Sequence, residues 1–524
     1  MGRKALASVL AVAAVLAGCD SAPEPAAESA VLRVLAGSEL ADLEPVLDEA
    51  ARVTGVRVEF TFTGTLEGTE TLASGEADGA FDAVWFSSNR YPRSLPEADR
   101  RLGDEVKIMR SPVVLGLPEA KVRELGWDRT RPTWADIAEA AGQGRFTYGM
   151  TDPSASNSGF SALVGVASAL AGTGDAVTPD QIDAVAPAMT RFFSAQKLSA
   201  GSSGWLSEEY QRRLAGTAPG PKVDGLINYE SVLRTLPTPL TVVYPADGVV
   251  TADYPLTVLT SASADARAAH QRLADHLRSP ETQRRIMADT YRRPAVPGVA
   301  LSDEFAVRDL VELPFPATQD AMDALLRAYF NELRRPSRTL YVLDTSGSMQ
   351  GERIAGLKSA LVALTGADGS LVGRYRGFRS REEVTLLPFG TVPGRPRTFT
   401  LPPGDPAAEL ARISAYAEAL TARGGTAIYD SLVRAYELLG DPDPARFTSI
   451  VLMTDGENRN GSPLTAFERE LRASPSRAVP VFTVLYGESH AADMTRVAEL
   501  TGGEVFDARS SSLAEVFRDI RGYQ

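Results

Sequence analysis

The stretch Asp344-Thr345-Ser346-Gly347-Ser348-Met349 follows an apolar segment, residues 339–343, that is typical of a buried β-strand. Its aspartate and two serines stand at positions i, i+2 and i+4, so a turn after the strand can direct three side-chain oxygens toward one hard cation. Two more oxygen ligands follow at later strand ends or loops, in Gly424-Gly425-Thr426 and in Met453-Thr454-Asp455-Gly456. An all-oxygen set with few charges suits Mg²⁺, whereas zinc prefers nitrogen or sulfur. We therefore predict a site for Mg²⁺, or alternatively Mn²⁺ or Ca²⁺, formed by Asp344, Ser346, Ser348, Thr426 and Asp455.

Strands and helices alternate on both sides of this stretch, which predicts a doubly wound, Rossmann-like α/β domain over residues 338–524. In such a sheet, ligands bind at the carboxyl ends of the strands, where the predicted metal ligands stand. The apolar segments expected as strands after the first are residues 384–389, 449–453, 479–486 and 504–506. The amphipathic segments expected as helices are residues 352–365, 406–423, 427–439, 466–473, 491–501 and 513–520.

The metal set, together with this order of elements, closely resembles the von Willebrand factor type A domains and their metal-ion-dependent adhesion site. The resemblance implies that Ser346 and Ser348 bind the ion directly and that Thr426 joins them when the site is engaged. It implies that Asp344 and Asp455 act directly or through water, and that a carboxylate of a partner protein fills the open position. An aspartic protease loop would need glycine in place of Ser346 and a second, paired carboxylate loop, so that reading is rejected.

Residues 31–310 also alternate between strand and helix, which predicts a mostly parallel sheet. Strands are expected at residues 31–36, 56–62, 81–86, 107–117 and 146–150, and helices from Ser38 and at residues 133–141 and 160–171. Three strand-to-helix junctions are rich in serine: Ser38, Ser87-Ser88, and the segment of residues 154–158. Free N–H groups at helix starts and serine hydroxyls together suit a small anion or a carboxylate, although each serine alone is also an ordinary helix cap.

Five segments of this region resemble a bacterial extracellular solute-binding protein, most closely the two-lobed type that takes molybdate, sulfate and similar oxyanions. The resemblance implies two α/β lobes joined by two crossing strands, residues 31–110 with the segment after Tyr244 and residues 111–243, and a solute held between them. The segments are VLRVLAGSEL (31–40), FDAVWFSSNRY (81–91), SPVVLGLP (111–118), TDPSASNSGF (151–160) and SPETQRRIMADTYRRPA (279–295). Carried over by position, the solute-binding candidates are Ser38, Ser88, Ser111, Ser156 and Tyr229. A connector, residues 311–337, holds an amphipathic helix over residues 319–334.

The first residues are expected to be a signal segment rather than part of a fold. Arg3 and Lys4 precede an apolar run of residues 5–16, which is too short to span a bilayer. The run ends in Leu-Ala-Gly-Cys, which resembles a bacterial lipobox and implies cleavage after residue 18 and lipid attachment to Cys19. A plain signal peptide is the alternative. Residues 19–30 then form a polar tether, and the protein is expected at the extracytoplasmic face of the cell membrane.

The composition narrows the function classes. Lys+Arg number 54 and Asp+Glu 67, for a net charge of −13, which argues against nucleic acid as a partner. One cysteine and three histidines (His270, His276 and His490) leave little for a catalytic zinc or a histidine base, and no nucleophile–base pair is evident. The chain is therefore expected to be a binding protein and not an enzyme.

Three functions fit these features. The first is a membrane-anchored lipoprotein that captures a small solute in its N-terminal domain and grips a protein partner through the metal site. The second is the substrate-binding subunit of an ABC importer, delivering solute to a permease, with an accessory type A domain. The third is a surface assembly scaffold whose solute cleft is vestigial.

Overall fold

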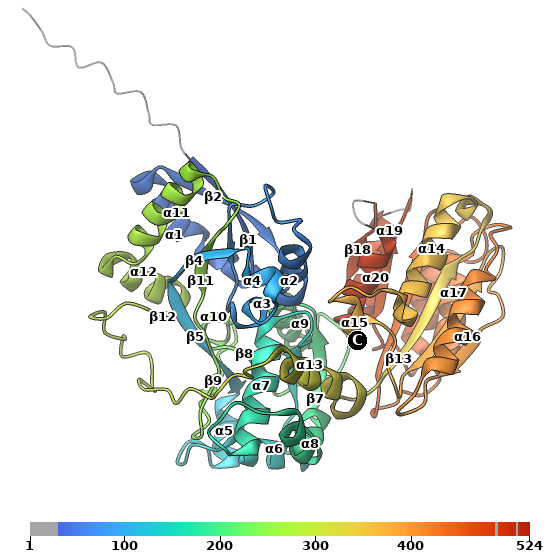
Figure 1. Ribbon diagram of the computed structural model, residues 1–524. Helices are drawn as coiled ribbons and strands as arrows, with labels where there is room; N and C mark the ends of the chain where they lie inside the picture. Colours follow the sequence, from blue (N-terminus) through green and yellow to red (C-terminus); the bar gives the residue numbers. More distant parts are fainter. Residues whose placement is uncertain (1–29, 488–490, 510–511, 524) are drawn as a thin grey trace, which may run out of the picture.

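The computed structural model describes residues 30–487, 491–509 and 512–523. Cys19, the predicted signal segment and His490 lie outside the described residues. Figure 1 shows an N-terminal part built from two stacked lobes and a C-terminal domain beside them. None of the described helices is long and apolar enough to cross a bilayer.

Lobe one is a sheet of strand order β2-β1-β3-β11-β4, flanked by helices. Its strands β1–β3 are parallel, whereas the returning strand β11 is antiparallel to β3 and β4. The strands are β1 (Ala30–Ala36), β2 (Val56–Phe62), β3 (Ala83–Trp85), β4 (Leu102–Lys107) and β11 (Pro255–Leu259). The helices are η1 (Ser38–Leu43), α1 (Glu44–Thr54), α2 (Thr65–Ser74), α3 (Arg90–Arg93), α4 (Pro96–Asp99), α11 (Ala264–Leu277) and α12 (Pro280–Thr290).

Lobe two is a second sheet of order β10-β5-β8-β6-β7, with β9 and β12 also paired to β5. The chain crosses between the lobes from β4 into β5 and returns from β10 into β11. The strands are β5 (Met109–Leu117), β6 (Tyr148–Thr151), β7 (Gln196–Ala200), β8 (Gly225–Tyr229), β9 (Thr241–Val243), β10 (Thr251–Ala252) and β12 (Arg293–Pro294). The helices are α5 (Glu119–Leu125), α6 (Trp134–Gly142), α7 (Asn157–Ala171), α8 (Pro179–Ser194), α9 (Ser203–Ala215) and α10 (Glu230–Thr235).

The connector packs on the N-terminal part. Helix α13 (Gln319–Ala328) and the π-helical turn η2 (Tyr329–Leu333) bury Leu325, Leu326 and Phe330 in the same apolar core as both lobes. The Tyr329 hydroxyl donates to Oε1 of Gln196 at the start of β7, at 3.1 Å. This packing holds the start of the next domain close to lobe two.

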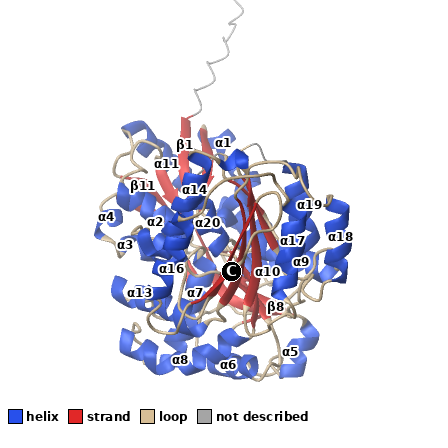
Figure 2. Ribbon diagram, turned by 90° about the vertical axis from the view of Figure 1, so that its right-hand side faces the viewer, coloured by secondary structure: helices blue, strands red, loops and turns tan. Residues whose placement is uncertain are grey.

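The C-terminal domain has the strand order β15-β14-β13-β16-β17-β18, with helices on both faces (Figure 2). All neighbouring pairs are parallel except β14 and β15. The strands are β13 (Ser337–Asp344), β14 (Glu383–Phe389), β15 (Arg397–Thr400), β16 (Phe447–Thr454), β17 (Val481–Leu485) and β18 (Val505–Asp507). The helices are η3 (Gly347–Met349), α14 (Glu352–Val362), η4 (Ala363–Ala367), α15 (Gly373–Arg376), α16 (Ala407–Glu418), α17 (Ile428–Leu439), α18 (Leu464–Ala473), α19 (Ala491–Thr501) and α20 (Leu513–Arg521).

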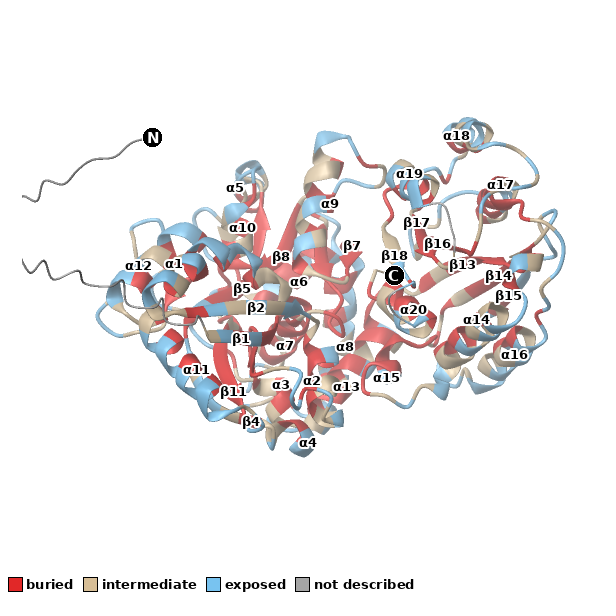
Figure 3. Cartoon of the chain, turned by 90° about the horizontal axis from the view of Figure 1, so that it is seen from above, coloured by how far each residue is buried: buried red, intermediate tan, exposed pale blue. Residues whose placement is uncertain are grey.

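The amino-terminal edge of this sheet faces lobe two. Helices α15 and α20 lie on the side of the domain that meets the lobes (Figure 3). The starts of β16 and β17 share a cavity of about 870 Å³ with β7 and α9. The carboxyl edge of the same sheet, where β13 ends at Asp344, therefore lies at the end away from lobe two.

The predicted fold class is confirmed, and most predicted elements are found within a few residues of their expected bounds. Two predictions are wrong. The sheets of residues 31–310 are not mostly parallel, because β5 and β11 pair with all of their neighbours in the antiparallel direction. The N-cap of the first helix is Gly37 and not Ser38, and Ser38 instead begins a 3-10 helix without a side-chain cap. The sequence does not predict the antiparallel strand β15, because Phe399 is the one buried residue of residues 397–400 and the segment carries little apolar signal.

Candidate functional site

The carboxyl edge of the C-terminal sheet brings four of the five predicted metal ligands into one hydrogen-bonded chain. The Ser346 amide donates to Oδ1 of Asp344 at 2.8 Å. The hydroxyls of Ser346 and Ser348 are 3.0 Å apart, and Ser348 donates to Oδ1 of Asp455 at 2.8 Å. Strand β13 positions the first three residues and β16 positions Asp455, since parallel neighbours end at the same edge.

Thr426 lies in a loop that is fastened to the same turn. The Gly347 amide donates to the Gly424 carbonyl at 2.9 Å. The Thr426 amide donates to Oδ1 of Asn460 at 3.0 Å, which fixes Thr426 two residues before the start of helix α17. The loop thus stands beside the Asp344–Ser348 turn.

The two carboxyl groups of this set are buried, and Ser348 is exposed. Burial raises the pKa of Asp344, hydrogen bonds from Thr454 and Ser346 oppose that rise, and the charge of Asp455 adds to it. Two carboxylates held close together with hydroxyls between them form the kind of oxygen donor set that suits Mg²⁺. The residues present therefore fit a divalent cation.

Arg353, in the first turn of α14, is a neighbour that the sequence reading missed. Its Nη1 donates to Oδ2 of Asp455 at 2.6 Å. A cation at this edge would share Asp455 with that guanidinium. Among the described residues, no cluster of three or more His, Cys, Asp or Glu side chains could hold a metal ion. The predicted set is of another kind, because three of its five ligands are hydroxyl groups.

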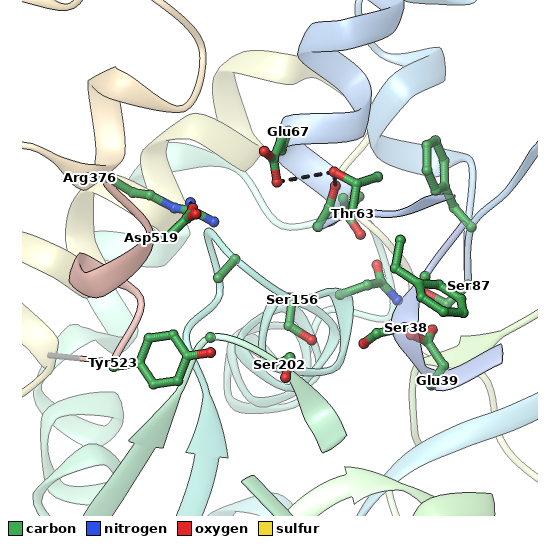
Figure 4. A pocket seen from close by; sticks show the side chains of 18 of the residues that line it. Ser38, Glu39, Thr63, Glu67, Ser87, Ser156, Ser202, Arg376, Asp519 and Tyr523 are labelled. Carbon is green, nitrogen blue, oxygen red and sulfur yellow. Dashed lines mark hydrogen bonds and ion pairs between the residues drawn. The ribbon is translucent and has the colours of Figure 1, made fainter. Parts of the chain in front are cut away.

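A second candidate site is a cavity of about 250 Å³ where the two lobes meet. Figure 4 shows the side chains that point into it. Lobe one lines it from the end of β1 and the β2–α2 and β3–α3 junctions, and lobe two from the β6–α7 and β7–α9 junctions. Its polar lining from the lobes consists of Ser38, Glu39, Thr63, Thr65, Glu67, Ser87, Ser156, Asn157 and Ser202.

Hydrogen bonds close the lobes against each other beneath this cavity. The Tyr229 hydroxyl of lobe two donates to Oγ of Ser87 in lobe one at 3.0 Å, and it accepts from Nδ2 of Asn157 at 3.1 Å. Beside them, burial raises the pKa of Glu39, while the charge of Arg292 opposes the rise. Arg292 itself is paired with Asp42 at 2.7 Å.

The five predicted solute residues are placed differently with respect to the cavity. Ser38 and Ser156 line it, and Tyr229 contacts the lining residues Ser87 and Asn157 from below. Ser88 and Ser111 do not line it. Ser88 accepts from the Arg90 amide at 3.3 Å, and Ser111 is fully buried and bonded to Ser231 at the crossing strands.

The cavity also has lining residues from the C-terminal domain, which the sequence reading missed. They are Arg376, Phe506, Asp519 and Tyr523. In Figure 4, Arg376, Asp519 and Tyr523 stand on the side opposite Ser38, Glu39 and Ser87. No sequence signal connects these residues with the lobes, because more than a hundred positions separate them from the lining residues of the lobes and they lie in no recognised motif.

Two family matches agree with these two halves. Residues 32–292 match the family described as bacterial extracellular solute-binding protein, and residues 338–506 match the von Willebrand factor type A domain. The chain joins a bacterial extracellular solute-binding domain to a type A domain. The extracellular family of the first domain indicates an extracytoplasmic location.

Individual relatives match only parts of the chain. An inter-alpha-trypsin inhibitor heavy chain H4 from Sus scrofa is 32% identical over 128 residues, which are 23% of this chain and 12% of that protein. A solved periplasmic thiamin binding protein matches with a TM-score of 0.43 and 14% identity, covering 57% of this chain and 96% of that one. A von Willebrand factor type A protein from Catenulispora acidiphila has a TM-score of 0.30 and 17% identity, covering 36% of this chain and 42% of that one.

Proposed function

We propose that this protein is a lipid-anchored, extracytoplasmic binding protein without catalytic activity. Its solute-binding domain captures a small solute between the lobes, and its type A domain binds an acidic group of a protein partner through a divalent cation. The anchor would be Cys19, which lies outside the described residues. The observation that carries the proposal is that the chain has two separate candidate sites with different chemistry. Oxygen ligands that suit a cation lie at the carboxyl edge of the type A sheet, and a polar cavity lies between the lobes, on the side where the type A domain meets them.

The size and lining of the cavity support a small polar solute. A volume of about 250 Å³ corresponds to roughly eight water molecules, at about 30 Å³ each. Serine and threonine hydroxyls, which both donate and accept hydrogen bonds, supply much of the lining. Such a lining recognises a polar molecule of limited size.

The carboxyl edge of the type A sheet, where Ser348 is exposed, supports the partner role. Asp344, Ser346, Ser348, Thr426 and Asp455 would hold the cation, with Ser348 facing solvent. A bound Mg²⁺ would supply an open coordination position for a carboxylate oxygen of the partner. The residues of this chain would orient the ion, because their hydroxyls and carboxylates are held in place by the hydrogen bonds between β13 and β16.

A metal-binding measurement tests the second half of the proposal. Isothermal titration of Mg²⁺ into the protein should give one site, and Asp344→Ala should abolish it. Asp441→Ala, which removes an exposed carboxylate elsewhere in the same domain, is the matched control and should bind Mg²⁺ normally. Equal binding by wild type and Asp344→Ala would contradict the metal site.

A native mass spectrum of the purified protein tests the first half. An added mass that is lost on denaturation would identify the solute. Absence of such a mass, together with no rise in the melting temperature for any solute tried, would contradict solute capture, because a ligand that binds only the folded state stabilises it.

A further inference from the structure

The cavity between the lobes is incomplete without the type A domain. Arg376 at the end of α15, Phe506 of β18, Asp519 of α20 and Tyr523 directly after α20 form a third side of its lining. Figure 4 shows Arg376, Asp519 and Tyr523 directed toward the same space as Glu67, Ser156 and Ser202. The cavity is therefore lined by three bodies and not by two lobes alone.

The type A domain fits closely on lobe two at this point. The Tyr523 ring lies 4.8 Å from the Trp205 ring in an edge-to-face arrangement. Gly201 makes room for it, since a Cβ at that position would stand 2.7 Å from Cε2 of Tyr523. A Cβ on Gly522 would lie 3.3 Å from that of Ala155. Such close approach, with glycine where the contact is tightest, is typical of packed interfaces.

The same domain also holds lobe one. Leu371, Val372 and Tyr375, which lie between α14 and β14, are buried in the apolar core that the lobes and the connector share. The Val372 amide donates to Oε2 of Glu70 in α2 at 3.3 Å. Because the type A domain contacts both lobes, the lobes can separate only when one of these contacts is released.

The charges that face the cavity indicate the class of solute. Among the described lining residues there are three carboxyl groups, Glu39, Glu67 and Asp519, and one guanidinium, Arg376. Arg376 is already paired with Asp519 at 2.9 Å, and Arg292, which lies behind the lining beside Glu39, is paired with Asp42 at 2.7 Å. Glu39 and Glu67 therefore leave carboxyl groups in excess around the cavity. Like charges repel strongly in a partly buried site, so this lining disfavours an anion and attracts a cation.

We propose that the type A domain is an integral wall of the solute site and that this site takes a small organic cation, such as a primary amine or a quaternary ammonium compound. The proposal rests on the proposed function, namely that a solute binds between the lobes. It replaces the oxyanion that the sequence resemblance implied. Separation of the two lobes then requires the type A domain to leave one of them, so solute binding between the lobes and domain docking stabilise each other.

Three variants test whether the third wall exists. Gly201→Val places a branched side chain against the Tyr523 ring and should undock the type A domain, whereas Gly204→Val, three residues away with open space around it, should not. Tyr523→Ala removes the wall without a clash. Hydrogen–deuterium exchange of α20 and of residues 371–376 reports docking. Faster exchange in Gly201→Val and Tyr523→Ala, but not in Gly204→Val, is expected, and unchanged exchange in both would overturn the proposal.

The solute class is tested by melting-temperature shifts with a panel of small primary amines and quaternary ammonium ions that includes putrescine and choline. Sulfate, phosphate and molybdate serve as the oxyanion probes. At least one cation should raise the melting temperature of the wild type, and its affinity should fall about tenfold or more in Tyr523→Ala. A shift with oxyanions only, or with no cation of the panel, would overturn the assigned class.

The outcomes separate this proposal from the proposed function. A wild-type protein that copurifies with no solute and responds to no probe contradicts solute capture itself. If the wild type and the variants Tyr523→Ala and Gly201→Val bind a solute with equal affinity, solute capture stands, but the type A domain is not a wall of the site.

Discussion

The predicted metal edge, formed by Asp344, Ser346, Ser348, Thr426 and Asp455, and the candidate solute cleft are assembled in opposite ways. The five metal residues all belong to one domain, and four of them are joined by hydrogen bonds at the ends of two neighbouring strands. The cleft draws its lining from lobe one, lobe two and the type A domain, over positions from Gly37 to Tyr523. A site of the first kind forms when one domain folds, whereas a site of the second kind also depends on how the domains dock.

The largest expected effect is a loss of stability when a buried charge cluster at the amino-terminal edge of the type A sheet is broken. Glu382 accepts from Arg334 of the connector at 2.9 Å and from Arg521 of α20 at 2.7 Å. Burial alone would raise the pKa of Glu382, but the charges of Arg521 and Arg334 hold that pKa below its usual range. Glu382→Gln leaves two buried guanidinium groups without their carboxylate and should cost about 3–5 kcal/mol of unfolding free energy. Urea unfolding followed by circular dichroism measures it.

The adjacent residue provides the control for that variant. Glu383 pairs with Arg338 at 2.8 Å, and both side chains are partly exposed. Glu383→Gln should therefore cost less than about 1 kcal/mol. Equal losses in the two variants would show that the Glu382 cluster does not hold this edge.

A smaller effect on solute affinity should distinguish a serine that lines the cavity from one that was proposed from the sequence but lies outside it. Ser156 lines the cavity and makes no side-chain cap to α7, so Ser156→Ala should weaken solute binding without unfolding the helix. Loss of one neutral hydrogen bond of about 1 kcal/mol corresponds to roughly fivefold weaker binding. Ser88→Ala should leave the affinity unchanged, because Ser88 lies outside the lining. Titration calorimetry with the identified solute compares the two, and the reverse order would restore Ser88 as the contact.

The metal edge offers a test that should leave the cleft untouched. Arg353 competes with a cation for Asp455, so Arg353→Gln should bind Mg²⁺ several-fold more tightly than wild type, as expected when about 1 kcal/mol of competing ion pair is removed. Titration with Mg²⁺ gives the affinity, and solute binding serves as the internal control. Weaker Mg²⁺ binding would mean that Arg353 supports the site instead of competing with the ion.

The smallest effect is a pH dependence confined to lobe one. Burial lowers the pKa of His270, whose Nε2 lies 3.2 Å from the Leu256 carbonyl oxygen. The unfolded chain therefore takes up this proton at a higher pH than the folded chain, and stability is lost as the pH falls through about 6.5. Between pH 7 and pH 5 the loss should be about 1 kcal/mol or less, measured by urea unfolding. His270→Gln should flatten this part of the profile of stability against pH. An unaltered profile would show that another group causes the pH dependence of stability.

The sequence predicted the metal edge far better than the cleft for a physical reason. Metal ligands at strand ends lie in short segments with oxygen side chains at fixed spacings, and the sheet brings those segments together wherever strands are parallel. Asp344, Ser346 and Ser348 could therefore be chosen together. Ser38 and Ser156 could be found as hydroxyls at strand–helix junctions by the same logic.

The remaining cleft residues follow from docking, which leaves no local pattern. Arg376, Asp519 and Tyr523 belong to short or terminal elements whose own sequence shows only helix and turn. Gly201 and Gly522 matter because rings and small residues from distant parts of the chain meet there. Ser88 satisfied the junction pattern and Ser111 was carried over from the family resemblance, yet their hydroxyls are used by neighbouring backbone and side-chain groups.

The position of Tyr523 has a consequence for biosynthesis. Ribosomes make both lobes first, and about 230 residues separate Pro294, the end of the last strand of the lobes, from Tyr523, an interval of roughly 11–46 s at ordinary elongation rates. During that interval the lobes can fold, but their cleft lacks one side. A chain that stops short of α20 would carry two finished lobes and an open cleft, so the ability to retain solute would distinguish full-length molecules from prematurely ended ones.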